Sequence, residues 1–221
     1  MKGVVQHKYN TVVFDLDGTI LYTYAFHKKA FKAFFKKYWD ISDEVDISPF
    51  ISNTMKEIYK KIGIPAEKIS FYQSALNNFY KNEVNDLYNG LVVPQDMLKV
   101  LQLLKIKGIK MAVISNSSDV FVKKVIESKG LSSFFDFVSG MELDFGDKVN
   151  RCAALLNGTS WKGNFIYIGD TPGDIEMSNK LGIDSILLYS ALSWMYPYDY
   201  KLMDPKPTYT ILFKRIIEYL N

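Results

Sequence analysis

The sequence predicts an α/β protein in which helices cover both faces of a parallel sheet and a separate helical segment is inserted near the N-terminus. Two observations predict the sheet: short, continuously apolar runs recur along the chain, and helical patterns separate most of them. A third observation predicts the insert. Roughly ninety residues of mostly helical pattern lie between the first two apolar runs, many more than one crossover needs.

Six apolar segments are predicted to be strands. Four have a continuous apolar pattern and two a less regular one. The continuous segments are residues 12–14, 111–114, 165–168 and 186–188, and the less regular ones are 135–138 and 209–212. Right-handed crossovers would bring the carboxyl ends of these strands to one edge of the sheet, which is where ligands bind in open α/β folds.

Four helices are predicted between these strands, each with a recognisable start or stop signal. They run from Pro94 to Gly108, from Val120 to Ser128 before Gly130, from Lys148 to about Leu156, and from Thr171-Pro172 to just before Gly182. Thr171 suits an N-cap, and Pro172 suits the first helical turn.

Three further helices are predicted in the insert. In the first, the aromatic residues between Phe31 and Tyr38 recur at helical spacing, with lysines on the opposite side. The second begins at Ser48-Pro49 and ends at Gly63, and the third runs from about Ala66 to Tyr88 before Asn89-Gly90. We expect two domains: an α/β core formed by residues 1–21 and 91–221, and a helical cap formed by residues 22–90, over the end of the first strand.

Composition narrows the class of protein. The 221 residues carry a net charge of +3 without a concentrated Lys/Arg block, so we expect no nucleic-acid partner. Cys152 is the only cysteine, so the fold cannot depend on an intrachain disulfide. There is no signal-peptide pattern after Met1, and no apolar run is long enough to cross a bilayer. A soluble, cytoplasmic protein without a membrane partner is expected, as a monomer or a homodimer.

Two carboxylates stand at the end of the first predicted strand, in the stretch FDLDGT. Residues two apart in an extended segment point the same way, so Asp15 and Asp17 share a direction. An Asp-Gly turn would account for Asp17 and Gly18. It does not account for Asp15, which lies nearer the buried run and would cost free energy there without a partner.

Other strand ends supply polar groups that would meet these two aspartates. Ser115 and Asn116 follow the second long strand, Asp170 follows residues 165–168, and Asp174 and Lys148 lie near helix starts. Three of them have an ordinary reading on their own: Ser115 as an N-cap, Asp174 as a first-turn acid and Lys148 as an exposed lysine. Asp170 resists such a reading, because it lies before the cap and at the strand end. Gathered at one edge of a sheet, they suit phosphoryl transfer.

The chemistry of that set is coherent. Clustered carboxylates are a Mg²⁺ site, because Mg²⁺ prefers hard oxygen ligands. An aspartate can attack phosphorus and form an aspartyl-phosphate, and a hydroxyl and an ammonium can hold the phosphoryl oxygens. A second carboxyl group can protonate the leaving oxygen and then take a proton from water.

These motifs resemble those of the haloacid dehalogenase-like superfamily, in its phosphoglycolate phosphatase-like branch with a type I helical cap. The resemblance rests on FDLDGT at 14–19, ISNSS at 114–118, Lys148 and IGDTPGDIE at 168–176, and it extends over nearly the whole chain. It implies a Rossmann-like core with an all-helical cap and a Mg²⁺-dependent phosphatase.

The resemblance also implies a role for each acid. Asp15 would be the nucleophile and a Mg²⁺ ligand. Asp17 would be the general acid and base, and its backbone carbonyl would also contact the metal. Asp170 would ligate Mg²⁺ directly or through water, and Asp174 would support it.

For the remaining groups, the resemblance implies that Ser115 binds the transferring phosphoryl group with Asn116 beside it, while Lys148 steadies that group and the nucleophile. Two departures from the family pattern are visible: Lys148 is followed by Val rather than Pro, and Tyr22 stands where relatives often have Asp. His27 lies on the first insert helix, and we interpret it as structural rather than catalytic.

The leading hypothesis is a phosphatase of a small phosphorylated metabolite. A phosphomutase resembling β-phosphoglucomutase would share every core motif and remains an alternative. A haloacid dehalogenase is disfavoured by Asp17, because its chemistry needs no acid for an oxygen leaving group. A non-catalytic binding domain is disfavoured because all four acids are present.

Overall fold

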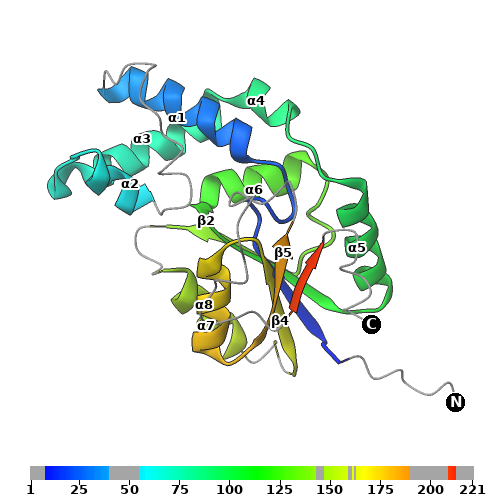
Figure 1. Cartoon of the computed structure of the whole chain (residues 1–221). Helices are drawn as coiled ribbons and strands as arrows, with labels where there is room; N and C mark the ends of the chain where they lie inside the picture. The colour runs from blue at the N-terminus through cyan, green and yellow to red at the C-terminus, as the bar shows by residue number, and fades with distance from the viewer. Residues whose placement is uncertain are drawn as a thin grey trace, which may run out of the picture.

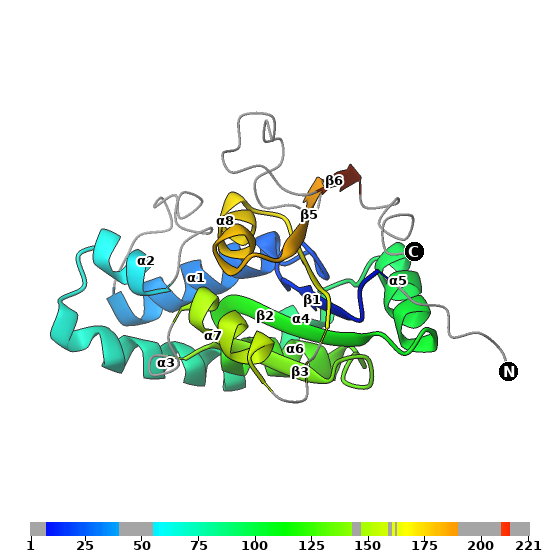
Figure 2. The same ribbon diagram turned by 90° about the horizontal axis from the view of Figure 1, so that it is seen from below.

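The core of the protein is a six-stranded parallel sheet, as the computed structural model shows for residues 8–39, 55–142, 147–158, 161, 163–189 and 209–212 (Figure 1). The strand order is β3-β2-β1-β4-β5-β6, with β3 and β6 at the two edges (Figure 2). The strands are β1 (Thr11–Phe14), β2 (Lys110–Ser118), β3 (Phe137–Met141), β4 (Phe165–Gly169), β5 (Asp184–Tyr189) and β6 (Tyr209–Leu212). The predicted α/β fold class is confirmed.

Both faces of the sheet are covered by helices, because its central strands are apolar on both sides. Along β1, Val12 and Phe14 face one hydrophobic cluster and Val13 faces the other. The first cluster includes side chains of α5 (Gln95–Ile106) and α6 (Asp119–Ser128), and the second includes side chains of α7 (Lys148–Leu156) and α8 (Pro172–Leu181). The β1 backbone therefore runs through the middle of the core and emerges at the carboxyl edge.

Most predicted helix ends are confirmed. Gly108 and Gly182 follow α5 and α8 with φ of 68° and 67°, a left-handed conformation that favours glycine. Pro172 begins α8 directly after Thr171. A helix after residue 212, suggested by the family resemblance, lies outside the described residues.

Two strand predictions were wrong in their boundaries. β2 continues past Ile114 to Ser118, because it keeps pairing with β3 across a register shift, and Ser118 caps α6 by accepting the N–H of Phe121 at 3.3 Å. β3 begins at Phe137 rather than at residue 135. Asp136 holds the chain just before it, since its N–H and its carboxylate both bond to the backbone of Met111.

The insert between β1 and β2 is helical, as predicted, and lies at the end of the sheet where β1 emerges (Figure 1). Its elements are α1 (Tyr24–Trp39), α2 (Met55–Lys61), the 3₁₀ turn η2 (Ala66–Lys68), α3 (Ile69–Asn82) and α4 (Asn85–Asn89). Buried aromatic rings pack it, such as Phe34 of α1 against Phe79 of α3, with centroids 5.6 Å apart. The predicted start of the second helix at Ser48 lies outside the described residues.

The third insert helix was predicted as continuous from residue 66 to 88, and that prediction was wrong. The chain leaves the helix at Val84, where φ is −111° and ψ is 24°. Val84 turns its side chain into the core, and the Asn85 side chain donates to the carbonyl of Asn82 at 3.3 Å. Within the described part of the chain, no helix is both long and apolar enough to span a membrane.

Candidate active site

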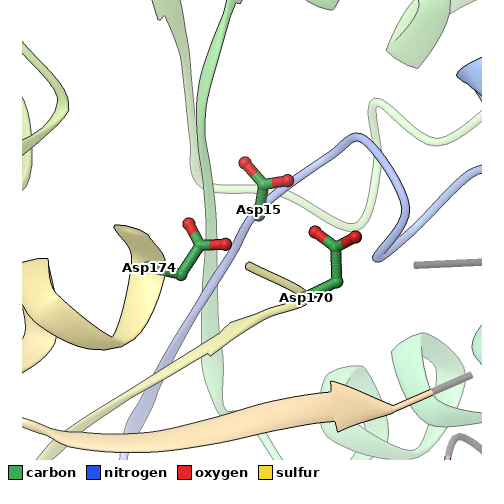
Figure 3. Close-up of side chains that lie close together, drawn as sticks. All are labelled: Asp15, Asp170 and Asp174. Atoms are coloured by element: carbon green, nitrogen blue, oxygen red, sulfur yellow. The ribbon is translucent and has the colours of Figure 1, made fainter. Parts of the chain in front are cut away.

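Three buried carboxylates converge at the carboxyl edge of the sheet (Figure 3). Asp15 directly follows β1, Asp170 directly follows β4, and Asp174 lies in the first turn of α8. Each offers a carboxylate oxygen, and the three oxygens lie within 4.8 Å of one another. Three hard oxygen donors at this spacing fit a Mg²⁺ ion, which prefers such ligands and keeps several waters.

Lys148 lies beside this cluster, although it is followed by Val149 where the family pattern has Pro. Its Nζ is 2.5 Å from Oδ1 of Asp15 and 2.6 Å from Oδ1 of Asp174. The carboxylate of Asp147 accepts the N–H of Asn150 at 2.8 Å, so α7 begins at Lys148. Burial works to lower the pKa of the ammonium, but Asp15 and Asp174 outweigh it and raise that pKa above the usual lysine value.

The acids around Asp15 make its ionisation unfavourable. The pKa of Asp15 is raised to about 7: burial is the largest cause, Asp174 and Asp17 add to it, and Lys148 only partly opposes these effects. A metal ion at the cluster would add positive charge beside Asp15 and favour the carboxylate, which is the nucleophilic form.

Asp17 points its carboxylate at a different set of partners. One oxygen accepts hydrogen bonds from the hydroxyls of Ser115 at 3.0 Å and Ser117 at 2.6 Å. The other lies 3.0 Å from Nε2 of His27. Burial works to raise the pKa of Asp17, but His27, Ser117 and Thr23 outweigh it and lower that pKa to about 2.

The end of β2 is held in place by hydrogen bonds to its own Ser115, from Ser117 and from Arg151 of α7. The hydroxyl of Ser115 also accepts the N–H of Ser117 at 3.0 Å, and Arg151 donates to the carbonyl of Ser115 at 2.9 Å. Asn116 lies between the two serines and is half-buried, and it takes part in none of the contacts just described. Ser117 and Arg151 were not predicted as site residues, although Ser117 stands two residues from Ser115 in the same extended strand.

His27 is buried and satisfied, as expected of a structural histidine, but one of its partners is Asp17. Its Nδ1 lies 3.0 Å from the hydroxyl of Tyr80 on α3. Nothing in the sequence indicated Tyr80, because it lies 53 residues from His27. The sequence also does not show which element each face of its helix packs against.

Gly169 leaves the space that Asp174 occupies. A Cβ atom on Gly169 would lie 2.4 Å from Cγ of Asp174. Asp174 cannot move freely to avoid it, because its Oδ2 accepts the hydroxyl and the N–H of Thr171 at 2.7 and 3.1 Å. Glycine at this strand end therefore sets the position of a carboxylate in the acidic cluster.

The Gly169→Ala variant is expected to lose roughly 1–3 kcal/mol of stability, the usual range for overpacking, and to bind a divalent cation more weakly at the acidic cluster. Thermal unfolding and calorimetry measure the two effects. Gly173→Ala is the matched control, since its Cβ would lie 3.8 Å from the nearest atom, Oγ1 of Thr171. Equal behaviour of the two variants would contradict this role for Gly169.

Together, the fold and the site are a Rossmann-like sheet with buried carboxylates and a lysine at its carboxyl edge. The chain belongs to the haloacid dehalogenase-like hydrolase family, whose model matches residues 12–188.

Two curated relatives are named as a phosphatase and a pyrophosphatase. Phosphoglycolate phosphatase of Aquifex aeolicus (strain VF5) is 25% identical over 223 residues, covering 94% of this chain and 99% of its own. The pyrophosphatase PpaX of Listeria monocytogenes serotype 4b (strain CLIP80459) is 26% identical over 195 residues, covering 85% of this chain and 84% of its own.

Solved structures share the fold over most of the chain. A predicted phosphatase from Clostridium acetobutylicum matches with a TM-score of 0.78 at 22% identity, covering 95% of this chain and 99% of its own. A haloacid dehalogenase-like family hydrolase from Streptococcus pneumoniae matches with a TM-score of 0.76 at 17% identity, covering 97% and 99%. At these identities the likeness concerns the fold alone.

Proposed function

We propose that the protein is a Mg²⁺-dependent phosphatase that hydrolyses a small phosphorylated metabolite through an aspartyl-phosphate on Asp15. The observation that carries the proposal is the buried cluster of Asp15, Asp170 and Asp174 with Lys148 against two of its carboxylates. The names of the curated relatives agree with phosphate-ester chemistry.

Each side chain has a step to perform. The Asp15 carboxylate attacks phosphorus while Lys148 and the hydroxyl of Ser115 hold the phosphoryl oxygens. The bond from phosphorus to the ester oxygen breaks, and Asp17 in its protonated form gives that oxygen its proton. Asp15, Asp170 and Asp174 would hold the Mg²⁺ ion, which would neutralise negative charge on the phosphoryl group. Asp17 then takes a proton from water, which attacks the aspartyl-phosphate.

Asp17 must change its protonation state during this cycle. Its partners hold it as a carboxylate, which is the form that activates water. To protonate the leaving oxygen, it must first gain a proton. When the hydroxyl of Ser115 turns toward a phosphoryl oxygen, Asp17 loses one of its hydrogen-bond donors, and that loss raises its affinity for a proton.

The test of the proposed function is phosphate release from a panel of phosphorylated metabolites. Turnover is expected with Mg²⁺ and is expected to vanish in excess EDTA. Asp170→Asn should weaken Mg²⁺ binding measured by calorimetry, while Asp96→Asn, an exposed acid paired with Lys99, should not. Parental turnover after complete metal removal would contradict the metal requirement.

We further propose that residues 22–90 act as a cap domain that governs substrate choice. Its position at the carboxyl end of β1 supports this, since lids of this kind exclude water and complete a binding pocket (Figure 1). A folded variant carrying the cap of another family member is expected to rank phosphate esters as the donor does. If the ranking stayed that of the parent, the residues that select the substrate would lie in the α/β core domain instead.

A further inference from the structure

A chain of three buried polar side chains joins the helical insert to the site. Asp17 contacts Nε2 of His27 at 3.0 Å, and Nδ1 of His27 contacts the hydroxyl of Tyr80 at 3.0 Å. His27 belongs to α1 and Tyr80 to α3, and each is only 2% exposed. Water therefore cannot replace either contact without a rearrangement of the insert.

The contact with Asp17 assigns one hydrogen atom on the ring. An ionised carboxylate only accepts hydrogen bonds, so Nε2 of His27 carries the hydrogen that it donates to Asp17. At Nδ1 the ring is held by the hydroxyl of Tyr80, which can either donate to that nitrogen or accept from it. Burial raises the pKa of Tyr80 well above its usual value, so this hydroxyl keeps its hydrogen.

We propose that Tyr80 is a positioning residue, which holds the His27 ring in one orientation and thereby aims Asp17 at the leaving oxygen. The proposal rests on the proposed function of Asp17 as acid and base. Without the hydroxyl of Tyr80, the His27 ring can turn, and Asp17 then loses a fixed donor on one of its oxygens.

Tyr80 is itself held in place by the core. Its ring lies 5.4 Å from that of Phe121 on α6, and the ring of Phe121 lies 4.5 Å from that of His27. Lys124, one turn later on α6, donates to the carbonyl of Lys81 and to the side chain of Asn85. The contact of α3 with α6 therefore places Tyr80 relative to Asp17, and the insert contributes to proton transfer as well as to substrate choice.

Tyr80→Phe tests the proposal, with Tyr88→Phe as the matched control. The hydroxyl of Tyr88 is buried in the same aromatic cluster, but it donates to the backbone carbonyl of Tyr80 at 3.0 Å. For an alkyl phosphate, which needs a protonated leaving oxygen, Tyr80→Phe should lower kcat at least about tenfold with KM little changed. This loss is a part of the roughly 10²–10⁴-fold that acid–base catalysis supplies. For nitrophenyl phosphate, the loss should be several times smaller.

Combination with His27→Gln tests whether Tyr80 acts through His27. Tyr80→Phe is expected to add little to the loss that His27→Gln already causes, because the two side chains act in series. The proposal would be overturned if the losses in the double variant were additive. It would also be overturned if Tyr80→Phe lost equally on both esters, or if its kcat equalled that of Tyr88→Phe.

A second measurement does not depend on turnover. The chain has two histidines, His7 and His27, so the ring nitrogens can be assigned by ¹⁵N NMR. The His27 signals should be the same in the parent and in Tyr88→Phe, and they should be shifted or averaged in Tyr80→Phe, where the contact at Nδ1 is lost. Unchanged His27 signals in Tyr80→Phe would overturn the proposal even with an active parent. An inactive parent with the expected signals would instead contradict the proposed function.

Discussion

Asp15→Asn is expected to form no phosphoenzyme, whereas Asp17→Asn is expected to accumulate one. An amide at position 15 is a poor nucleophile, so no leaving group is released in a burst. An amide at position 17 leaves Asp15 and Lys148 in contact but removes the group that activates water. Nitrophenyl phosphate should still react with this second variant, because nitrophenolate needs little protonation to leave.

Intact-protein mass spectrometry after an acid quench distinguishes the two variants. The phosphoenzyme of Asp17→Asn should outlive that of the parent by roughly 10²–10⁴-fold, the usual contribution of general acid–base catalysis. Asp96→Asn serves as a control, because that side chain is exposed and lies in a surface ion pair. A phosphoryl adduct on Asp15→Asn, or parental turnover by Asp17→Asn, would refute this division of roles.

Lys148→Met is expected to abolish activity and to destabilise the fold by about 3–5 kcal/mol, the usual result when one partner of a buried ion pair is removed. The variant leaves the carboxylates of Asp15 and Asp174 facing each other without their shared cation. Lys99→Met is the matched control. Its ion pair with Asp96 is exposed and should be worth less than about 1 kcal/mol.

The destabilisation of Lys148→Met should depend on pH in the presence of EDTA. The pKa of Asp15 is already raised to about 7 in the folded parent, and loss of Lys148 raises it further. A carboxyl group with a raised pKa favours the folded state at low pH, and that contribution is lost as the pH rises through the folded pKa. Urea unfolding at pH 5 and pH 8 should therefore show the larger deficit at pH 8, and an equal deficit would contradict the assignment.

The placement of the acids could be predicted because parallel strands bring the residues that follow them to one edge of the sheet. Once residues 12–14 and 165–168 are recognised as parallel strands, Asp15 and Asp170 must emerge at the same edge. The N-cap at Thr171 and the first-turn acid at Asp174 were also visible in the sequence, and in the structure the Asp174 carboxylate accepts the hydroxyl and the N–H of Thr171. These inferences need only local patterns and one topological rule.

The features that were predicted wrongly, or not predicted, all depend on tertiary contacts. The break at Val84 depends on which way that side chain turns, and the extension of β2 to Ser118 depends on pairing with β3. Tyr80 is an ordinary aromatic residue in an aromatic-rich insert until α3 packs against α6 and brings it to His27. A single sequence contains no periodicity that assigns these partners.

The central position of β1 has a consequence for how the chain folds. Thr11 pairs with Lys110 on one side and with Phe165 on the other, so the first strand to be synthesised must wait for partners 99 and 154 residues further along. Closing such long loops costs entropy before any ladder forms, whereas the contacts within α1, α3 and α4 are closer in sequence. We expect the insert to gain structure early and the sheet to be completed late. A nascent chain that ended before residue 165 would thus expose β1 on one side, as a site for aggregation or for a chaperone.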